Sequence, residues 1–186
     1  FHVSDKSLSE LFSTWPGQGI AVMAIDGVYR GEREEKGKDI FMPDPAASAA
    51  NMKAQILDIL RGFDVLASWK SIDPGRIGYM GISAGACTGA AAVALDNRIR
   101  TAILADGAAD FSIIFQNSDY GDVADIKKYM DEHKISPAEM WKSFVFVDPL
   151  SFAPQLGDRP ILLMNGETDT TMTMPAMKKL HDLDEV

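Results

Sequence analysis

The sequence predicts an α/β protein built as a three-layer αβα sandwich around a mostly parallel sheet. Short apolar runs at 19–25, 76–80, 101–105 and 160–164 have the length and composition of buried strands, and turn residues precede each of them. Helix-forming stretches separate these runs, and such alternation is typical of a parallel sheet covered on both faces. The 186 residues are 46% hydrophobic, which suffices for one core, and no stretch resembles a spacer between domains.

The first half of the chain begins with a stretch expected to form a short helix, Ser7 to Ser13, followed by the apolar strand Gly19 to Ile25. A loop rich in charge and glycine then runs from Gly31 to Asp39. Met42-Pro43-Asp44-Pro45 predicts a stop followed by a helix start, because proline is favoured in the first helical turn. Between Ala46 and Trp69, apolar residues recur every three or four positions, which predicts one long helix packed on the sheet.

The alternation continues with a strand-like run from Arg76 to Met80 and an alanine-rich, helix-prone segment from Ala84 to Leu95. The segment 111–150 interrupts it with two short helical stretches, near 122–132 and 137–144, before the last strand. We interpret this segment as a small helical cap insertion into a single domain that spans residues 1–186. Its aromatic residues could line a substrate pocket, although a small satellite core is the commoner role for any one of them: Phe111, Phe115, Tyr120, Trp141 and Phe144.

The composition excludes several classes of partner. A formal net charge of −9, with no basic stripe, argues against nucleic acid or an anionic membrane and favours a small neutral or cationic ligand. The single cysteine, Cys87, allows no internal disulfide and no metal-ligand spacing, so we expect no metal and no cofactor, and Cys87 itself is expected to be a small buried hydrophobe. No apolar run reaches the ~20 residues of a membrane span. The chain starts with Phe1, which fits a cytoplasmic protein or a secreted one without its leader.

The motif Gly81-Ile82-Ser83-Ala84-Gly85 lies between a predicted strand and a predicted helix. A GxSxG run in this context is the form of a nucleophile elbow, in which a sharp turn holds the serine in a strained conformation with its oxygen exposed. Ser83 is therefore the candidate nucleophile. The alternative is a tight strand-to-helix turn that merely packs small residues. A nucleotide-binding fold is disfavoured, because no GxGxxG run follows a strand.

Four segments, taken in order, resemble the α/β-hydrolase superfamily and are most similar to its dienelactone hydrolase and acetyl xylan esterase-like serine esterases. They are Gly19 to Arg33 (GIAVMAIDGVYRGER), Asp73 to Ala86 (DPGRIGYMGISAGA), Arg98 to Asp106 (RIRTAILAD) and Asp148 to Asp169 (DPLSFAPQLGDRPILLMNGETD). The second and fourth segments are the ones most specific to this superfamily. The resemblance implies an α/β-hydrolase fold and a serine hydrolase that acts on a small-molecule carboxylic ester.

The resemblance also implies roles for particular residues. It places the acid of a catalytic triad at Asp169, with Glu167 as a competitor in the same loop and Asp106 as an alternative acid after the preceding strand. The N–H of Ala84 would form half of an oxyanion hole. Family members usually carry His-Gly before the strand that corresponds to Gly19–Ile25. Here His2 stands at about that position without the glycine, so we assign no second oxyanion donor.

The base of the triad has no good candidate in the sequence. The chain order of this fold is serine, acid and histidine, and only His181 follows Asp169. His181 falls late in an expected amphipathic helix from Pro175 to Asp184, which would run away from the strand ends that carry the site. His133 lies in a charged run and is expected to be solvated. We therefore expect the base beyond Val186, and we expect this sequence to be a fragment at both ends.

The sequence thus predicts a serine hydrolase that cleaves carboxylic esters through an acyl-enzyme on Ser83. Two alternatives stay open. A serine peptidase or amidase of the same fold would use the same nucleophile, oxyanion hole and base. A non-catalytic relative that binds a ligand or partner would need no base.

Overall fold

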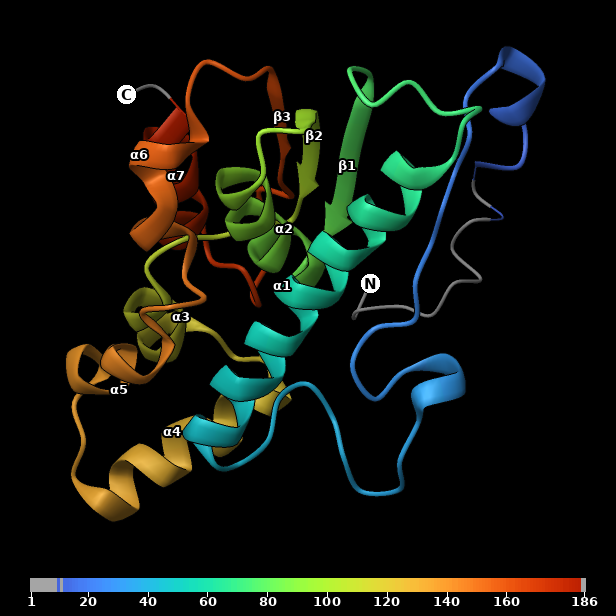
Figure 1. Ribbon diagram of the computed structural model, residues 1–186. Coiled ribbons are helices and arrows are strands. Elements are labelled where there is room, and N and C mark those ends of the chain that lie inside the picture. Colours follow the sequence, from blue (N-terminus) through green and yellow to red (C-terminus); the bar gives the residue numbers. More distant parts are fainter. Residues whose placement is uncertain (1–9, 11, 185–186) are drawn as a thin grey trace.

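The computed structural model describes residue 10 and residues 12–184, so most of the expected helix at Ser7–Ser13 lies outside the described residues. Its centre is a parallel sheet of strands β1 (Ile77–Ile82), β2 (Ile99–Ala105) and β3 (Ile161–Met164), in that order (Figure 1). Helices α1 (Pro45–Ser68) and α2 (Ala84–Leu95) pack together, and α2 lies on β1 and β2. The predicted α/β class with a parallel sheet and flanking helices is confirmed.

The two faces of the sheet differ in what covers them. The register places Gly81, Leu104 and Leu163 in one row across the sheet, and α2 packs on this side, where Gly81 and Leu104 are buried. The side chains of the neighbouring row point to the opposite face of the sheet, and this row consists of Met80, Ile103 and Leu162. On that face Met80, Leu162 and Met164 are 39%, 53% and 51% exposed. The described residues therefore leave an apolar sheet face open to solvent.

The strand expected at Gly19–Ile25 does not form. This segment is extended and runs beside β1 on the side away from β2 (Figure 1), but it is in no sheet ladder. A groove of about 770 Å³ lies between them and is lined by residues of both segments and of α1. The apolar run has the composition of a strand, yet a strand also needs a partner edge, and among the described residues no backbone hydrogen bond joins this segment to β1.

Local sequence explains where the long helices begin and end. Asp44 caps α1 by accepting a hydrogen bond from the N–H of Ala46, and Pro45 occupies the first turn, as predicted. The helix buries Met52, Ile56 and Phe63 along one face. The last helix, α7 (Met174–Asp184), packs near the end of β2, where Ala109 donates its N–H to the carbonyl of Ala176. Two single-turn 3-10 helices, η2 (Pro16–Gln18) and η3 (Gly31–Arg33), lie in the N-terminal part.

The segment between β2 and β3 is mostly helical. It contains α3 (Phe111–Asn117), α4 (Gly121–His133), α5 (Pro137–Phe144), η4 (Pro149–Phe152) and α6 (Ala153–Leu156). The helices expected near 122–132 and 137–144 are confirmed as α4 and α5, whereas α3 and α6 were not predicted. Figure 1 shows α3, α4 and α5 gathered beyond the carboxyl ends of the strands. They therefore lie at the end of the sheet where the GxSxG turn emerges.

A buried carboxylate, Asp148, joins three parts of this segment. Its Oδ1 accepts from the N–H groups of Asp110 and Leu150 at 3.0 and 2.9 Å, and its Oδ2 accepts from the N–H of Phe111 and the indole of Trp141 at 2.6 and 2.7 Å. The residue is completely buried. Burial raises the pKa of the Asp148 carboxyl, and the four hydrogen bonds oppose that rise. One side chain thus fixes the starts of α3 and η4 and holds α5 against them.

We predict that Asp148→Asn destabilises the protein by roughly 2–4 kcal/mol. Each oxygen accepts two hydrogen bonds, so either orientation of the asparagine turns its NH₂ toward two N–H donors. Urea unfolding measures the change. Trp141→Phe serves as control, because it removes one donor and should cost about 1 kcal/mol. Equal stability of Asp148→Asn and the wild type would contradict the role given to this carboxylate.

Candidate active site

Ser83 sits at the sharp turn between β1 and α2, in a backbone conformation that only strong local constraints maintain. Its φ and ψ are 57° and −121°, and it occupies the N-cap position of α2. The N–H of Ser83 donates to the carbonyl of Ala105 at the end of β2, at 2.8 Å. The carbonyl of Ser83 accepts from the N–H groups of Ala86 and Cys87. Hydrogen bonds on both sides therefore hold the residue in its strained conformation.

The glycines of the motif are required by a close approach of backbone to backbone. A Cβ placed on Gly81 would lie 2.3 Å from the carbonyl oxygen of Gly85. The hydroxyl of Tyr79 donates to that same oxygen at 2.7 Å, and burial raises the pKa of Tyr79, so the phenol stays a neutral donor. A Cβ on Gly89 would lie 2.0 Å from the Tyr79 ring. Tyr79 was not among the predicted site residues, although the glycines at 81, 85 and 89 indicate room for a large side chain.

The start of α2 adds hydrogen-bond donors beside Ser83. Ala84 is the first residue of this 12-residue helix and is buried. Its N–H donates to none of the described residues, as expected for the first turn of a helix. The positive end of the helix dipole also lies here. The turn thus places the hydroxyl-bearing Ser83 next to the backbone N–H of Ala84.

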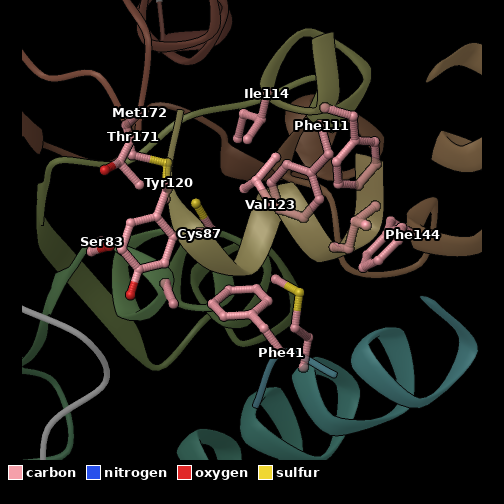
Figure 2. Close-up of a pocket in the computed structure, with 14 residues that line it drawn as sticks. Phe41, Ser83, Cys87, Phe111, Ile114, Tyr120, Val123, Phe144, Thr171 and Met172 are labelled. Carbon is pink, nitrogen blue, oxygen red and sulfur yellow. The ribbon is translucent and has the colours of Figure 1, made fainter. Parts of the chain in front are cut away.

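Ser83 and Ala84 both line a pocket of about 50 Å³ (Figure 2). The predicted aromatic residues Phe111, Phe115, Tyr120 and Phe144 line it too, whereas Trp141 instead binds Asp148. Several other lining residues were not predicted, because they are aliphatic residues of the same segment or come from distant parts of the chain. They are Phe41, Met52, Ile114, Val123, Ile126, Thr171 and Met172. Cys87, predicted to be a small buried hydrophobe, is buried and lines the pocket.

The loop after β3 brings Asp169 close to this pocket. Its Oδ1 accepts from the N–H groups of Thr171 and Met172 at 2.7 and 3.0 Å, and these two residues line the pocket with Ser83. No described residue donates to Oδ2 of Asp169. The carboxylate is half-buried and therefore oriented by its own loop while one oxygen stays available. Glu167, the competitor in this loop, is exposed.

Asp106, the alternative acid, shapes the same loop from the end of β2. It has a positive φ of 49°, and its N–H donates to the carbonyl of Met164 at 2.6 Å. Its Oδ1 accepts from the N–H of Gly166 at 3.2 Å. Asp106 does not line the pocket. Its contacts tie the ends of β2 and β3 together.

No described histidine lines the pocket. His181 lies on α7, and its Nε2 is 3.0 Å from Oδ1 of Asn165. The Nδ2 of Asn165 donates to the carbonyl of Gly107, so Oδ1 faces His181 and the Nε2 of His181 is the donor. His133 is exposed, and its ring stacks on Tyr129 with centroids 4.0 Å apart. His2 lies outside the described residues.

We predict that Gly81→Ala destabilises the protein by roughly 1–3 kcal/mol, because the new methyl group would overlap the Gly85 backbone. Urea denaturation gives the free energy of unfolding. Gly121→Ala is the control, since nothing lies within 4 Å of a Cβ there and its φ is not positive. Similar stabilities of the two variants would show that the approach of Gly81 to Gly85 is not tight.

Comparisons with known proteins identify the fold and the family of the chain. The model of the prolyl oligopeptidase family (peptidase S9) matches residues 7–183. Acetyl xylan esterase 1 from Thermoanaerobacterium sp. is 16% identical with a TM-score of 0.72, over 98% of this chain and 62% of that one. The acetyl xylan esterase from Paenibacillus sp. R4 is 18% identical with a TM-score of 0.73, over 98% of this chain and 61% of that one.

The acylaminoacyl peptidase from Pyrococcus horikoshii is 22% identical with a TM-score of 0.56, over 70% of this chain and 21% of that one. The chain thus spans about three-fifths of the length of the two esterases and a smaller part of the peptidase. Among curated sequences no significant match was found. These likenesses confirm the α/β-hydrolase fold that the sequence predicted. Since the family model covers nearly the whole chain, the protein belongs to the prolyl oligopeptidase family of α/β-hydrolases.

Proposed function

We propose that this protein is a serine hydrolase that cleaves carboxylic esters through an acyl-enzyme on Ser83. The observation that carries the proposal is the strained backbone of Ser83 beside the first N–H of α2, at a pocket that can receive a substrate group. A serine in an ordinary packing turn has no need of a strained conformation or of a pocket. Together these features favour a nucleophile over the small-residue turn.

The proposed reaction begins when Oγ of Ser83 attacks the ester carbonyl carbon and gives its proton to a histidine base. The carbonyl oxygen becomes an oxyanion, to which the N–H of Ala84 donates. The intermediate collapses as the alkoxy group leaves with the proton held by the histidine. Water then attacks the acyl-enzyme by the same steps, releasing the acid and restoring the hydroxyl of Ser83.

We assign Asp169 as the acid that orients the histidine. Its Oδ1 is engaged by the N–H groups of Thr171 and Met172, which fixes the carboxylate while Oδ2 is left for the Nδ1–H of an imidazole. Such a carboxylate sets the tautomer of the base and stabilises the imidazolium. Asp106 fits this role less well, because its Oδ1 holds the loop through Gly166.

We infer that the base lies beyond Val186 in a longer chain. His181 donates to Asn165 and does not line the pocket. Two features of the sheet support a longer chain: the groove of about 770 Å³ beside β1, and the exposed apolar side chains Met80, Leu162 and Met164. A further strand in the groove and a further layer on this face would bury apolar surface that is now open. In this proposal residues 1–186 form an incomplete single domain, with 111–150 as its cap.

A peptidase or amidase is the second candidate function. The family match and the likeness to an acylaminoacyl peptidase favour it. The ester assignment is supported by the likeness to two acetyl xylan esterases over 98% of the chain, against 70% for the peptidase. Comparing hydrolysis of matched ester and anilide substrates separates the two functions. If neither is cleaved and Ser83 also fails to react with a fluorophosphonate probe, a binding protein without catalysis is the remaining explanation.

We expect a fluorophosphonate probe to label Ser83 in the full-length protein, because such probes react with an activated serine hydroxyl. Ser83→Ala should abolish labelling. Ser68→Ala should leave it unchanged, because Ser68 is an exposed residue at the end of α1. Mass spectrometry of the labelled peptide identifies the site. A folded full-length protein that stays unlabelled would refute the proposal of a serine hydrolase.

We expect Asp169→Asn to lower kcat by about 10⁴-fold with little change in KM, because the base would adopt the wrong tautomer. Steady-state kinetics with an ester substrate measures the effect. Asp106→Asn keeps an oxygen that can accept from Gly166, and should lower kcat by less than about tenfold. The opposite order of effects would transfer the role of the acid to Asp106.

A further inference from the structure

We propose that the pocket beside Ser83 binds the acyl chain of the substrate and selects uncharged chains of about four carbons. This inference rests on the proposed hydrolase function and adds the substrate class to it. Three properties of the pocket carry it: the chemistry of its lining, the place where it opens, and its size.

The lining excludes charged groups. Of the fourteen residues that line the pocket, only Ser83, Tyr120 and Thr171 have an oxygen in the side chain, and none has a carboxylate, ammonium, guanidinium or imidazole. Burial raises the pKa of the Cys87 thiol to about 12, so this group is also neutral. A charged substrate group would lose its hydration here without gaining a partner. An aliphatic chain would replace empty space with contacts at no such cost.

The nucleophile lies at a more exposed end of the pocket. Figure 2 shows the oxygens of Ser83, Tyr120 and Thr171 at one end and the side chains of Phe111 and Phe144 at the other. The three hydroxyl-bearing residues are half-buried, whereas Phe111 and Phe144 are buried. The pocket therefore deepens away from Ser83 into the apolar packing of α3, α4 and α5.

This orientation assigns the pocket to the acyl side of the ester. The carbonyl carbon must reach Oγ of Ser83 with its oxygen toward the N–H of Ala84, which places the carbonyl at the mouth. The alcohol leaves first and water must then enter, so the alcohol side needs a path to solvent. The acyl group stays attached through both steps and can remain in the closed end.

The volume sets the length of the chain. A single water needs roughly 10–15 Å³ of cavity, so a pocket of about 50 Å³ holds on the order of three to five non-hydrogen atoms. A butanoyl chain places three carbons beyond the carbonyl. Longer chains would have to displace side chains such as Ile126 on α4 and Phe115 on α3, both of which are buried in the core. The predicted optimum is therefore near four carbons.

Hydrolysis of p-nitrophenyl esters by the full-length protein tests this inference. From acetate to butanoate, kcat/KM should rise about fourfold per added methylene, the gain expected from burying one CH₂. Beyond hexanoate it should fall. A second series, acetates of aliphatic alcohols of increasing length, should vary less than threefold, because the alcohol stays outside the pocket.

A pair of variants on α4 locates the effect. Ile126→Ala enlarges the pocket and should move the optimum to chains at least two carbons longer. Met130→Ala is the matched control, because Met130 is buried one turn further along the same helix and does not line the pocket. If Ile126→Ala fails to fold, Val123→Ala makes a smaller deletion in the same wall and should favour chains about one carbon longer.

The outcomes separate this inference from the function on which it rests. Absence of both hydrolysis and Ser83 labelling would overturn the hydrolase itself, and the acyl site with it. Hydrolysis that depends on Ser83 but is indifferent to acyl length would overturn only the acyl pocket. A steep dependence on the alcohol, shifted by Ile126→Ala, would assign the pocket to the leaving group and also refute the proposal.

Discussion

The site depends on one backbone contact, the approach of Gly81 in β1 to Gly85 in α2. No single carbon atom fits between them, and the hydroxyl of Tyr79 donates a hydrogen bond to the carbonyl of Gly85. This contact forces the chain to reverse within one residue, and Ser83 bears the resulting strain in its φ of 57°. A strained residue persists only where its surroundings over-determine it. Here a hydrogen bond from Ser83 to β2 and the first turn of α2 do so.

The second feature on which the site depends is a buried carboxylate. Asp148 places a completely buried carboxylate among four N–H donors that belong to α3, α5 and η4. A buried ion is costly to desolvate, and only saturated hydrogen bonding makes it tolerable. The aromatic side chains Phe111 and Phe144 pack edge to face beside it, with centroids 6.1 Å apart. The wall of the pocket is thus held by a polar centre next to an apolar cluster.

The parts of the fold that sequence could predict are those fixed by neighbours in the chain. The elbow, the capped start of α1 and the helices α4 and α5 follow from local patterns of glycine, proline and apolar spacing. The prediction of a strand at 19–25 was wrong, because strand pairing depends on a partner edge that no local pattern specifies. For the same reason Phe41, Met52 and Met172 could not be assigned to the pocket. The contact of His181 with Asn165 joins residues 16 positions apart and was likewise invisible. Tyr79 is the exception, since the glycines that accommodate it could have revealed it.

The free edge of β1 has a consequence for the behaviour of these residues in solution. Among the described residues β1 pairs only with β2, so every second N–H and C=O along its other edge faces the groove. Beside it lies a sheet face with methionine and leucine side chains exposed. An open edge next to an apolar face is a template on which another strand can add. A strand that paired with this edge would therefore also protect the sheet from association with a second molecule.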